Sequence, residues 1–412
     1  MELKIVIHDP SMTSPPIVTE VRRPSIWLIY SITLAGILAN SLVTPNIPDI
    51  LADLGQPDSR AGLLVASGPS PGIVLAPVVG VLADRFGRRQ VLLPCLVVFT
   101  IGGLGAAIAP TFGVLIAARL VQGVGSAGLI NLAVVLIADN WEGETRTRLI
   151  GRNSAVLTMA LAILPSVSGL VASVSSWRWS LGLSGLAAVV AAAVAIKLPN
   201  TVPEAARTLG AQLQGARRAI RDPRVLTALI AGFLLFVVIF GVFLTALPVH
   251  LENEFGLGPG ARGLVLSSSA AGAAFASFNV ARVRAIIPLR RLLVLSSVGI
   301  AIASLGVGLS PVIIGVVIAK LLYGLGDGLT ISTLQDVVAS APAAEDRASV
   351  IAAWVSSVRL GQVVGPLAAS ALFAATSTSF AMVAGAALFG VVALMFTVAP
   401  IEAQPDQNSA TP

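Results

Sequence analysis

Ionisable side chains inside long apolar segments are the residues of this sequence best suited to carry chemistry. Arg119 stands in one such segment, with Gln122 one helical turn later. Lys320 and Asp327 stand seven residues apart in another, a spacing that places them on one face of a helix. A charge in hydrocarbon costs about 3 kcal/mol or more unless it meets water or a partner. We therefore expect these residues to bind a solute, carry a proton or pair with one another.

Asp327 lies near the middle of its apolar segment. An acid group that binds and releases a proton there would let a proton gradient drive work across a membrane. The same carboxylate could instead form a static ion pair with Lys320, or with Arg359 of the following segment. We expect Asp327 to be the proton-coupling group and keep the ion pair as the alternative.

Other polar and aromatic residues in the apolar segments could line a cavity for a solute or could simply bridge helices. The polar candidates for the cavity are Asn40, Gln122, Asn131, Lys320, Gln335 and Arg359. A stripe of four phenylalanines at helical spacing could form one wall of this cavity, or a packing surface. Its members are Phe233, Phe236, Phe240 and Phe243. From the stripe we select Phe236 and Phe240 as cavity candidates.

These residues are set in a very apolar chain. Of its 412 residues, 56% are hydrophobic and 11% are charged, whereas a soluble globular protein has about 25% charged residues. Twelve apolar segments are long enough for a helix of about 20 residues that crosses the hydrocarbon core. They cover residues 25–46, 61–82, 91–109, 112–138, 148–172, 178–198, 225–247, 261–281, 288–309, 312–339, 348–373 and 377–398. The sequence therefore predicts an all-α membrane protein with twelve transmembrane helices.

A polar break divides the twelve segments into two sets of six. It covers residues 199–224 and holds charges such as Glu204, Arg217 and Asp222, which would be too costly in lipid. We predict two six-helix bundles, 25–198 and 225–398, joined by this break as a cytoplasmic linker. Residues 1–24 and 399–412 are expected to be polar cytoplasmic tails.

Lysine and arginine are distributed unequally between the two sides of the predicted membrane. With the first tail in the cytoplasm, 20 of the 26 fall on the side of the tails. Only Arg60, Arg178 and Arg262 fall on the other side, and the last three lie within segments. Positively charged loops stay in the cytoplasm. The sequence thus predicts cytoplasmic termini in a cell inner membrane or plasma membrane.

The two sets of six segments carry a repeat. A shift of 201 positions superposes glycines, prolines and charged residues of the first set on identical residues of the second. The matched pairs are Gly105 and Gly306, Pro110 and Pro311, Gly123 and Gly324, Gly125 and Gly326, Glu144 and Glu345, Arg146 and Arg347, and Pro165 and Pro366. Arg119 falls on Lys320. This predicts two parallel repeats with pseudo-symmetry about an axis along the membrane normal.

The loop after the second segment has a recognisable pattern. It reads Gly80-Val-Leu-Ala-Asp84-Arg85-Phe-Gly87-Arg88-Arg89. Gly80 would let a neighbouring helix approach, Gly87 would allow a tight reversal, and Asp84 could meet a helix amino terminus or a cation. The pattern resembles the loop signature of the major facilitator superfamily. That resemblance implies a conformational latch, made of the six named residues, between the cytoplasmic faces of the two bundles in an outward-open state. The alternative is an ordinary basic loop.

Three further stretches are similar to the drug:proton antiporter branch of this superfamily. They are Gly36 to Pro48 in the first segment, Arg119-Leu-Val-Gln122-Gly123-Val-Gly125-Ser-Ala127 in the fourth, and Leu164-Pro165-Ser-Val-Ser168-Gly169 in the fifth. The fifth keeps the proline and one glycine of the branch pattern and lacks its other glycines. The resemblance implies that Arg119 takes part in proton or substrate handling. The alternative is a structural arginine that bonds helix carbonyls.

Motifs of other functional classes are absent from the sequence. No Walker sequence for ATP, no metalloprotease motif and no hydrolase elbow occurs. Cys95 is the only cysteine, so no intrachain disulfide or cysteine-rich metal site can form. The basic residues are scattered, which argues against nucleic acid as a partner. His8 and His250 are isolated and are expected to be solvated. We expect no enzyme activity, metal or cofactor.

These observations together predict a secondary transporter that works by alternating access. Its partners would be the lipid bilayer, a small-molecule solute and protons, and it would act as a monomer. The leading expectation is proton-coupled efflux of drugs or other amphipathic compounds. The alternatives are a symporter or uniporter of a specific metabolite, such as a sugar or an amino acid, and a non-transporting membrane sensor or scaffold.

Overall fold

The structure is a computed structural model that describes residues 23–199, 220–340 and 347–401, together with residues 210, 214, 217 and 218. Within these ranges the chain forms helices and turns, and no strand. The predicted tails at 1–24 and 399–412 and the predicted linker at 199–224 lie mostly outside the described residues.

Helices make up the described chain. In chain order they are α1 (Ile26–Ser41), η1 (Thr44–Asn46), α2 (Ile47–Asp53), η2 (Asp58–Arg60), α3 (Ala61–Ser67), α4 (Ser70–Phe86), α5 (Arg88–Ala107), α6 (Phe112–Ser126), α7 (Leu129–Asn140), α8 (Gly143–Val174), α9 (Trp177–Gly182), η3 (Leu183–Gly185), α10 (Leu186–Lys197), α12 (Pro223–Val238), η4 (Ile239–Ala246), α13 (Leu247–Phe255), α14 (Pro259–Ile286), α15 (Leu289–Leu309), α16 (Ile313–Ser340), α17 (Arg347–Ala375) and α18 (Thr378–Val398).

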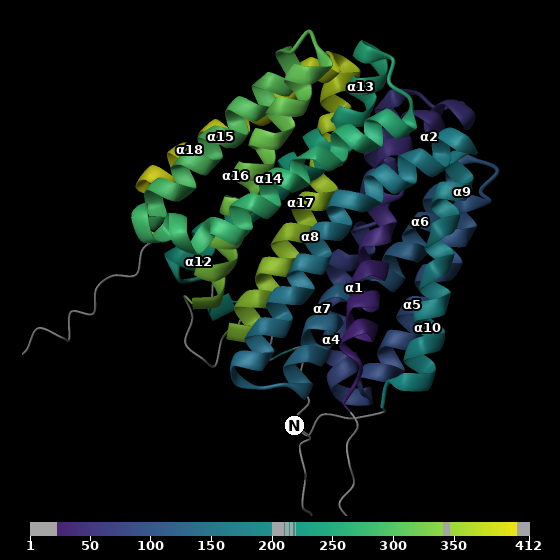
Figure 1. Cartoon of the computed structure of the whole chain (residues 1–412), viewed down its shortest axis with the longest axis vertical. Helices are drawn as coiled ribbons and strands as arrows, with labels where there is room; N and C mark the ends of the chain where they lie inside the picture. The colour runs from purple at the N-terminus through teal and green to yellow at the C-terminus, as the bar shows by residue number, and fades with distance from the viewer. Residues whose placement is uncertain are drawn as a thin grey trace, which may run out of the picture.

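Consecutive helices join into twelve spans of membrane length, which confirms the predicted fold. Spans 1 to 12 cover Ile26–Asp53, Asp58–Phe86, Arg88–Ala107, Phe112–Asn140, Gly143–Val174, Trp177–Lys197, Pro223–Phe255, Pro259–Ile286, Leu289–Leu309, Ile313–Val338, Ser349–Ala375 and Thr378–Val398. Spans 1–6 form the first bundle and spans 7–12 the second. In Figure 1 the first bundle, purple to teal, lies to the right of the second, which is green to yellow.

Prolines and glycines determine where the spans are interrupted. Pro45 and Pro48 lack a backbone N–H group, and between α1 and α2 the chain forms the short 3₁₀ turn η1. Gly87 has a φ of 98°, a conformation that favours glycine, and makes the turn from α4 to α5. This turn is the tight reversal predicted for the loop.

Several spans are longer than the predicted apolar segments. Span 5 runs over Gly143–Val174 instead of 148–172, so its first turns include Glu144 and Arg146. A helix can continue beyond the hydrocarbon because its backbone groups are bonded internally while charged side chains reach water. Hydropathy marks only the part of each helix that meets lipid.

The 201-residue repeat is visible in the packing as well as in the sequence. In the first bundle Gly123 of α6 lies against the backbone of Gly68 in span 2. In the second bundle Gly324 of α16 lies against the backbone of Ser269 in span 8. Both members of the second pair follow the first pair by 201 residues. The two bundles therefore pack equivalent helices through equivalent positions.

The two bundles bond to each other near one end of the spans, which we call the sealed side. Asp53, Asp58, Val174 and Phe255 mark this end. Here the Gly62 N–H donates to Ser370 Oγ at 2.6 Å, and Asn253 Nδ2 donates to Asp58 Oδ2 at 3.0 Å. Each of these hydrogen bonds joins the first bundle to the second.

The opposite end, which we call the open side, is bonded differently. It carries Phe86, Asn140 and Ile286. Between described residues its ion pairs stay within one bundle, such as Arg88 with Asp139 in the first. In Figure 1 the helices of the second bundle are tilted relative to those of the first. Among the described residues, the hydrogen bonds and ion pairs that join the two bundles therefore lie towards the sealed side.

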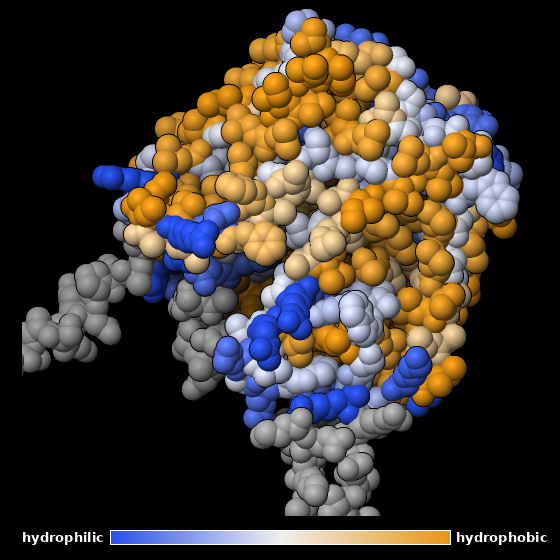
Figure 2. Space-filling model, viewed as in Figure 1, coloured by the Kyte–Doolittle hydropathy of each residue, from blue (hydrophilic) through white to orange (hydrophobic). Residues whose placement is uncertain are grey.

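Apolar side chains cover the outer faces of the spans. Large hydrophobic residues such as Ile108, Val174, Ile196 and Ile286 are about 80% exposed, and Figure 2 shows apolar surface over both bundles, with hydrophilic residues mainly towards the lower ends. A contiguous apolar surface of this size marks contact with lipid. The surface thus agrees with twelve membrane-spanning helices.

Single-cysteine labelling tests this arrangement of ends. In a Cys95→Ala background, Lys197→Cys and Arg291→Cys should react with a membrane-impermeant maleimide from the same side, because both residues lie at the open side. Glu254→Cys, near the sealed side, should react from the opposite side. Modification of Lys197→Cys and Arg291→Cys from different sides would refute the fold.

Candidate functional site

Arg119 is held inside the first bundle by neutral groups. It is 1% exposed. Its Nη1 donates to the Ala39 carbonyl at 2.7 Å and to Gln122 Oε1 at 2.6 Å, and its Nη2 donates to Asn40 Oδ1 at 2.8 Å. Gln122 in turn donates to Ser184 Oγ at 3.2 Å. These acceptors come from α1 and α6, and they solvate the guanidinium group without cancelling its charge.

Lys320 occupies the equivalent position of the second bundle and has a different environment. It is 3% exposed. Its Nζ lies 4.8 Å from the centre of the Phe243 ring and 4.7 Å from that of Tyr323. The two rings are 3.7 Å apart. Tyr323 stands 201 positions after Gln122, so an aromatic residue replaces the amide that serves Arg119.

Asp327 lies two helical turns beyond Lys320 on α16. Its carboxyl group lies near the side chain of Tyr323, one helical turn earlier. Its Oδ1 is buried and has no hydrogen-bond partner among the described residues. In the described part of the chain no nitrogen of Lys320 or Arg359 comes within 4.0 Å of this carboxylate. The static ion pair is therefore not formed in this conformation.

Arg359 of α17 reaches from the second bundle to span 2 of the first. Gly72 makes room for it, since a Cβ atom at Gly72 would lie 2.7 Å from Arg359 Nη1. One turn earlier, a Cβ atom at Gly68 would lie 2.5 Å from Arg119 Nη2. Two guanidinium groups, one from each bundle, thus lie against neighbouring turns of one span. Within the described ranges Arg359 makes no hydrogen bond or ion pair.

The other cavity candidates are not gathered around these charges. Phe236 and Phe240 lie side by side, with ring centroids 6.1 Å apart; Phe240 belongs to an apolar core that both bundles share, and Phe236 packs against it. Asn131 is half-buried in α7, and Gln335 is exposed near the open side of α16. The structure brings Asn40, Gln122 and Arg119 together, and it places Lys320 beside Phe243 instead of the two selected rings.

The six residues of the predicted latch lie at the open side. Arg88 is 6% exposed and bridges Asp84 at 2.5 Å and Asp139 at 2.9 Å. The remaining contacts are Arg85 over the Phe86 ring at 5.4 Å, Arg89 to the Ala195 carbonyl, and Gly87 in the turn. A Cβ atom at Gly80 would meet nothing within 4 Å. In this conformation no helix packs closely on Gly80, and these bonds stay within the first bundle.

A charge cluster at the sealed side was not found from the sequence. Arg262, counted in the sequence among the three basic residues of the side opposite the tails, is fully buried at the start of α14. It pairs with Glu252 of α13 at 2.5 Å and with Asp49 of α2, which belongs to the other bundle. The scarcity of basic residues on this side was the one available signal. The three partners are too far apart in the sequence for any spacing pattern to join them.

His250, predicted to be solvated, is also buried, at 2% exposed. Its Nδ1 lies 3.0 Å from Thr378 Oγ1 of α18. The prediction was wrong because α13 extends span 7 to Phe255 and packs this residue against the second bundle.

Close backbone contacts accompany the charge cluster. Gly62 of α3 lies against the Pro366 carbonyl of α17, and Gly263 of α14 lies against the Pro165 carbonyl of α8. The two contacts are related by the same shift of 201 positions. Neither glycine leaves room for a Cβ atom. The bundles thus meet through one contact that occurs twice.

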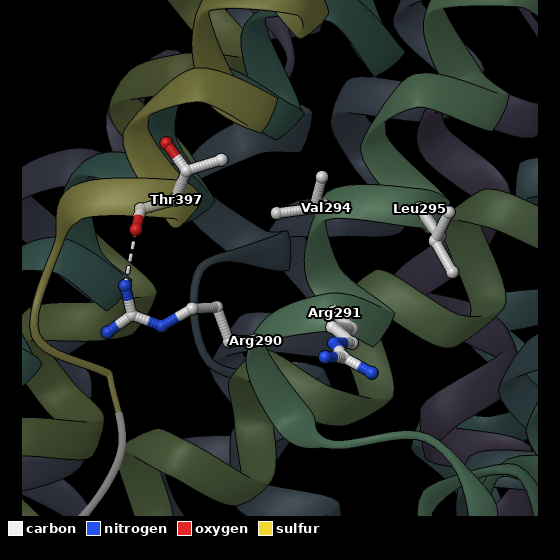
Figure 3. A pocket seen from close by; sticks show the side chains of 5 residues that line it. All are labelled: Arg290, Arg291, Val294, Leu295 and Thr397. Carbon is white, nitrogen blue, oxygen red and sulfur yellow. Dashed lines mark hydrogen bonds between the residues drawn. The ribbon is translucent and has the colours of Figure 1, made fainter.

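A separate depression of about 310 Å³ lies on the open-side ends of α15 and α18. Arg290, Arg291, Val294, Leu295 and Thr397 line it. Figure 3 shows Arg290 turned towards the Thr397 carbonyl, to which it donates, while Arg291 points away. It contains none of the central charges, and we do not assign it to the site. Among the described residues no group of three potential ligands could hold a metal ion.

Comparison with known proteins identifies a family. The model of the Major Facilitator Superfamily matches residues 29–366 and 241–412. The "Bacillibactin exporter" of Bacillus subtilis (strain 168) is 30% identical over 162 residues, 38% of this chain and 40% of that protein. "Quinolone resistance protein NorA" of Staphylococcus aureus (strain N315) is 28% identical over 233 residues, 56% of this chain and 55% of that protein. The chain therefore matches about half or less of the length of these curated relatives.

Two solved structures show the same fold over most of their length. A bacterial homologue of the human lysosomal transporter Spinster, in an inward-facing and unoccupied conformation, has a TM-score of 0.74 at 15% identity and covers 90% of this chain and 95% of its own. A D-xylose-proton symporter has a TM-score of 0.73 at 17% identity and covers 91% and 97%. The arrangement of twelve helices is thus shared with solved transporters.

Arg262→Gln should open the sealed side more often. The variant loses the charged bonds to Asp49 and Glu252, which weakens the seal by about 1.5–3 kcal/mol, roughly a tenfold or greater rise in the opened population. A Cys95→Ala chain with Asp58→Cys and Asn253→Cys reports closure through a short bifunctional thiol reagent.

Arg178→Gln is the matched control for this test. Arg178 pairs with Asp53 at 2.5 Å on the same side but within one bundle, so its loss should leave the crosslinking rate unchanged. Equal crosslinking in Arg262→Gln and the parent would remove Arg262 from the seal.

Proposed function

The chain belongs to the Major Facilitator Superfamily, and we propose that it exports small amphipathic compounds in exchange for protons. Its family and its fold make it a multi-pass membrane transporter, and not an enzyme. Two relatives carry names of exporters or resistance proteins, which supports export as the direction. We further propose that the protein acts as a monomer in a cell inner membrane or plasma membrane.

One observation carries the proposal: the hydrogen bonds and ion pairs between described residues that join the bundles all lie in the sealed half of the spans, while four charged residues lie deep in the spans. Those residues are Arg119, Lys320, Asp327 and Arg359. In alternating access, two repeats rock about a central site and close each mouth in turn. With both termini in the cytoplasm, the open side faces the cytoplasm. The structure then corresponds to the inward-open state, ready to load a solute for export.

The central residues have distinct proposed roles. Asp327 takes up and releases the coupling proton, supported by its buried oxygen without a partner and its neighbour Tyr323. Arg119, with Asn40 and Gln122, fixes the first-bundle wall of the site. Phe236, Phe240, Asn131 and Gln335 are retained as further candidates for the cavity walls.

We propose that the residues around the turn between α4 and α5 act when the open side closes during the transport cycle. Asp84 and Arg88 are bonded to one another in this conformation. When the open side closes, Asp84 would lie near the start of span 11 and hold the second bundle. The space beside Gly80 would then receive a helix of that bundle.

A flux panel in proteoliposomes tests the function directly. The purified chain is reconstituted with an imposed pH gradient, and uptake of labelled amphipathic compounds, sugars and amino acids is measured. Gradient-driven movement of an amphipathic compound, with proton movement in the opposite direction, is the expected result. Movement of only a sugar or an amino acid would replace the proposal with metabolite transport.

Asp327→Asn should abolish proton-driven accumulation and reduce it to the rate without a gradient, because the amide cannot exchange a proton. Solute exchange across the membrane should continue. Asp336→Asn is the matched control, since Asp336 lies on the same helix but pairs with Arg284 at the open side. Loss of folded Asp327→Asn protein in size-exclusion chromatography would favour a structural ion pair instead.

Asp84→Asn should lower turnover several-fold more than it lowers the amount of protein in the membrane. The amide keeps the shape of the side chain but cannot form the charged bonds of the latch. Turnover per molecule, measured with surface expression, checks this. Unchanged turnover would remove the latch from the mechanism.

A further inference from the structure

The charged residues deep in the spans are not balanced. Arg119, Lys320 and Arg359 are cationic, and Asp327 is the one carboxylate among the described residues at this depth. The other described acidic residues of the spans lie near their ends, such as Asp84 and Asp139 at the open side and Asp49 at the sealed side. The middle of the protein therefore has an excess of positive charge even when Asp327 is ionised.

No carboxylate of a described residue lies within 4.0 Å of the charged nitrogens of the three cations, although Asp327 interacts electrostatically with Lys320 along α16. Arg119 is bonded to two amide oxygens and one backbone carbonyl. Lys320 contacts two aromatic rings, which attract a cation but carry no net charge. Arg359 makes no hydrogen bond or ion pair within the described ranges. Buried charges in proteins are normally paired, because an unpaired charge is costly.

The positions of these cations suit one shared ligand. Arg359 belongs to the second bundle and Arg119 to the first, and both lie against neighbouring turns of span 2 through Gly68 and Gly72. Arg359 is intermediate in exposure, and its guanidinium group lies at the junction of the two bundles beside Gly72. Its planar donors match the geometry of a carboxylate or sulfonate group. An anion bound here would contact both moving bundles.

Apolar surface lies beside the charges. Lys320 rests on Phe243 and Tyr323, and Phe240 lies in the same core as Phe243. A ligand that pairs with the cations can therefore place an apolar or aromatic body near these rings, where its burial is favourable.

We propose, as a deepening of the proposed function, that the transported compound is an amphipathic organic anion whose carboxylate or sulfonate is bound by Arg359, while Lys320 contributes positive charge from the second bundle. Arg119 contributes positive charge from the first bundle. This inference rests on the proposed transport function and names the charge class of its substrate.

Matched naphthalene compounds test the charge class. The probes are 2-naphthylacetate, 2-naphthylethanol and 2-naphthylethylammonium, which share the ring and differ in the head group. Binding to the purified full chain and counterflow in proteoliposomes are measured for each. We expect the acid to bind at least about tenfold more tightly than the alcohol, since hydrogen bonds to charged groups have this strength. The amine should bind most weakly.

Variants test whether Arg359 and Lys320 cause the tighter binding of the acid. Arg359→Gln should remove most of the advantage of the acid and change binding of the alcohol less than about twofold, whereas Arg359→Lys should retain the advantage. Lys320→Gln should act like Arg359→Gln. Arg282→Gln is the matched control, because it removes one positive charge from an exposed residue at the open side. An excess of sodium chloride or sodium acetate distinguishes an organic anion from a simple ion, and neither salt should displace the acid.

Three results would overturn the inference. If the alcohol or the amine binds and moves better than the acid, the substrate is not an anion, while export stands. If Arg359→Gln and Lys320→Gln keep the full preference in folded protein, the preference arises elsewhere. If no naphthalene compound binds or moves, and the wider flux panel is also negative, the proposed function fails together with the charge class.

Discussion

A charge within the hydrocarbon region must be solvated by the protein itself, and this constraint shapes the middle of the molecule. Arg119 meets it through three oxygen acceptors from two helices. Lys320 meets it through two aromatic rings. Arg359 is placed instead between the bundles, where Gly72 leaves space for its guanidinium group. Spans 1, 2, 4, 7, 10 and 11 all contribute to this arrangement. The positions of the charges and the packing of the spans therefore depend on each other.

The two bundles share one packing arrangement but differ in the groups that surround the repeated cation. Equivalent glycines pack equivalent helices in both bundles, since Gly123 meets Gly68 as Gly324 meets Ser269. The cation at the repeat position is kept as Arg119 and Lys320, but its partner changes from an amide to an aromatic ring. The first bundle therefore holds its cation in a fixed polar network. The second holds its cation against two aromatic rings, and one oxygen of the nearby carboxylate of Asp327 has no hydrogen-bond partner among the described residues.

The seal between the bundles combines contacts that are close with contacts that can be broken. Gly62 and Gly263 allow two helix crossings at backbone distance, which hold the bundles by van der Waals packing. Arg262 adds ion pairs to Asp49 and to Glu252, whose carboxylates are partly exposed. Water can solvate those groups when the bundles separate. A seal of this kind stabilises the state in which the bundles are in contact at this side, and it can still open.

The twelve spans, the two related bundles and the charged residues within the membrane could be predicted from the sequence. These follow from local properties, because a hydrocarbon environment requires long apolar helices and makes each internal charge stand out. Which of these residues contact one another became visible in the folded chain. Asp49, Glu252 and Arg262 form one cluster although they come from three separate helices, and His250 is buried although its own segment looked solvated. Such contacts depend on how distant helices cross, and that geometry is not encoded in the spacing of residues along any one helix.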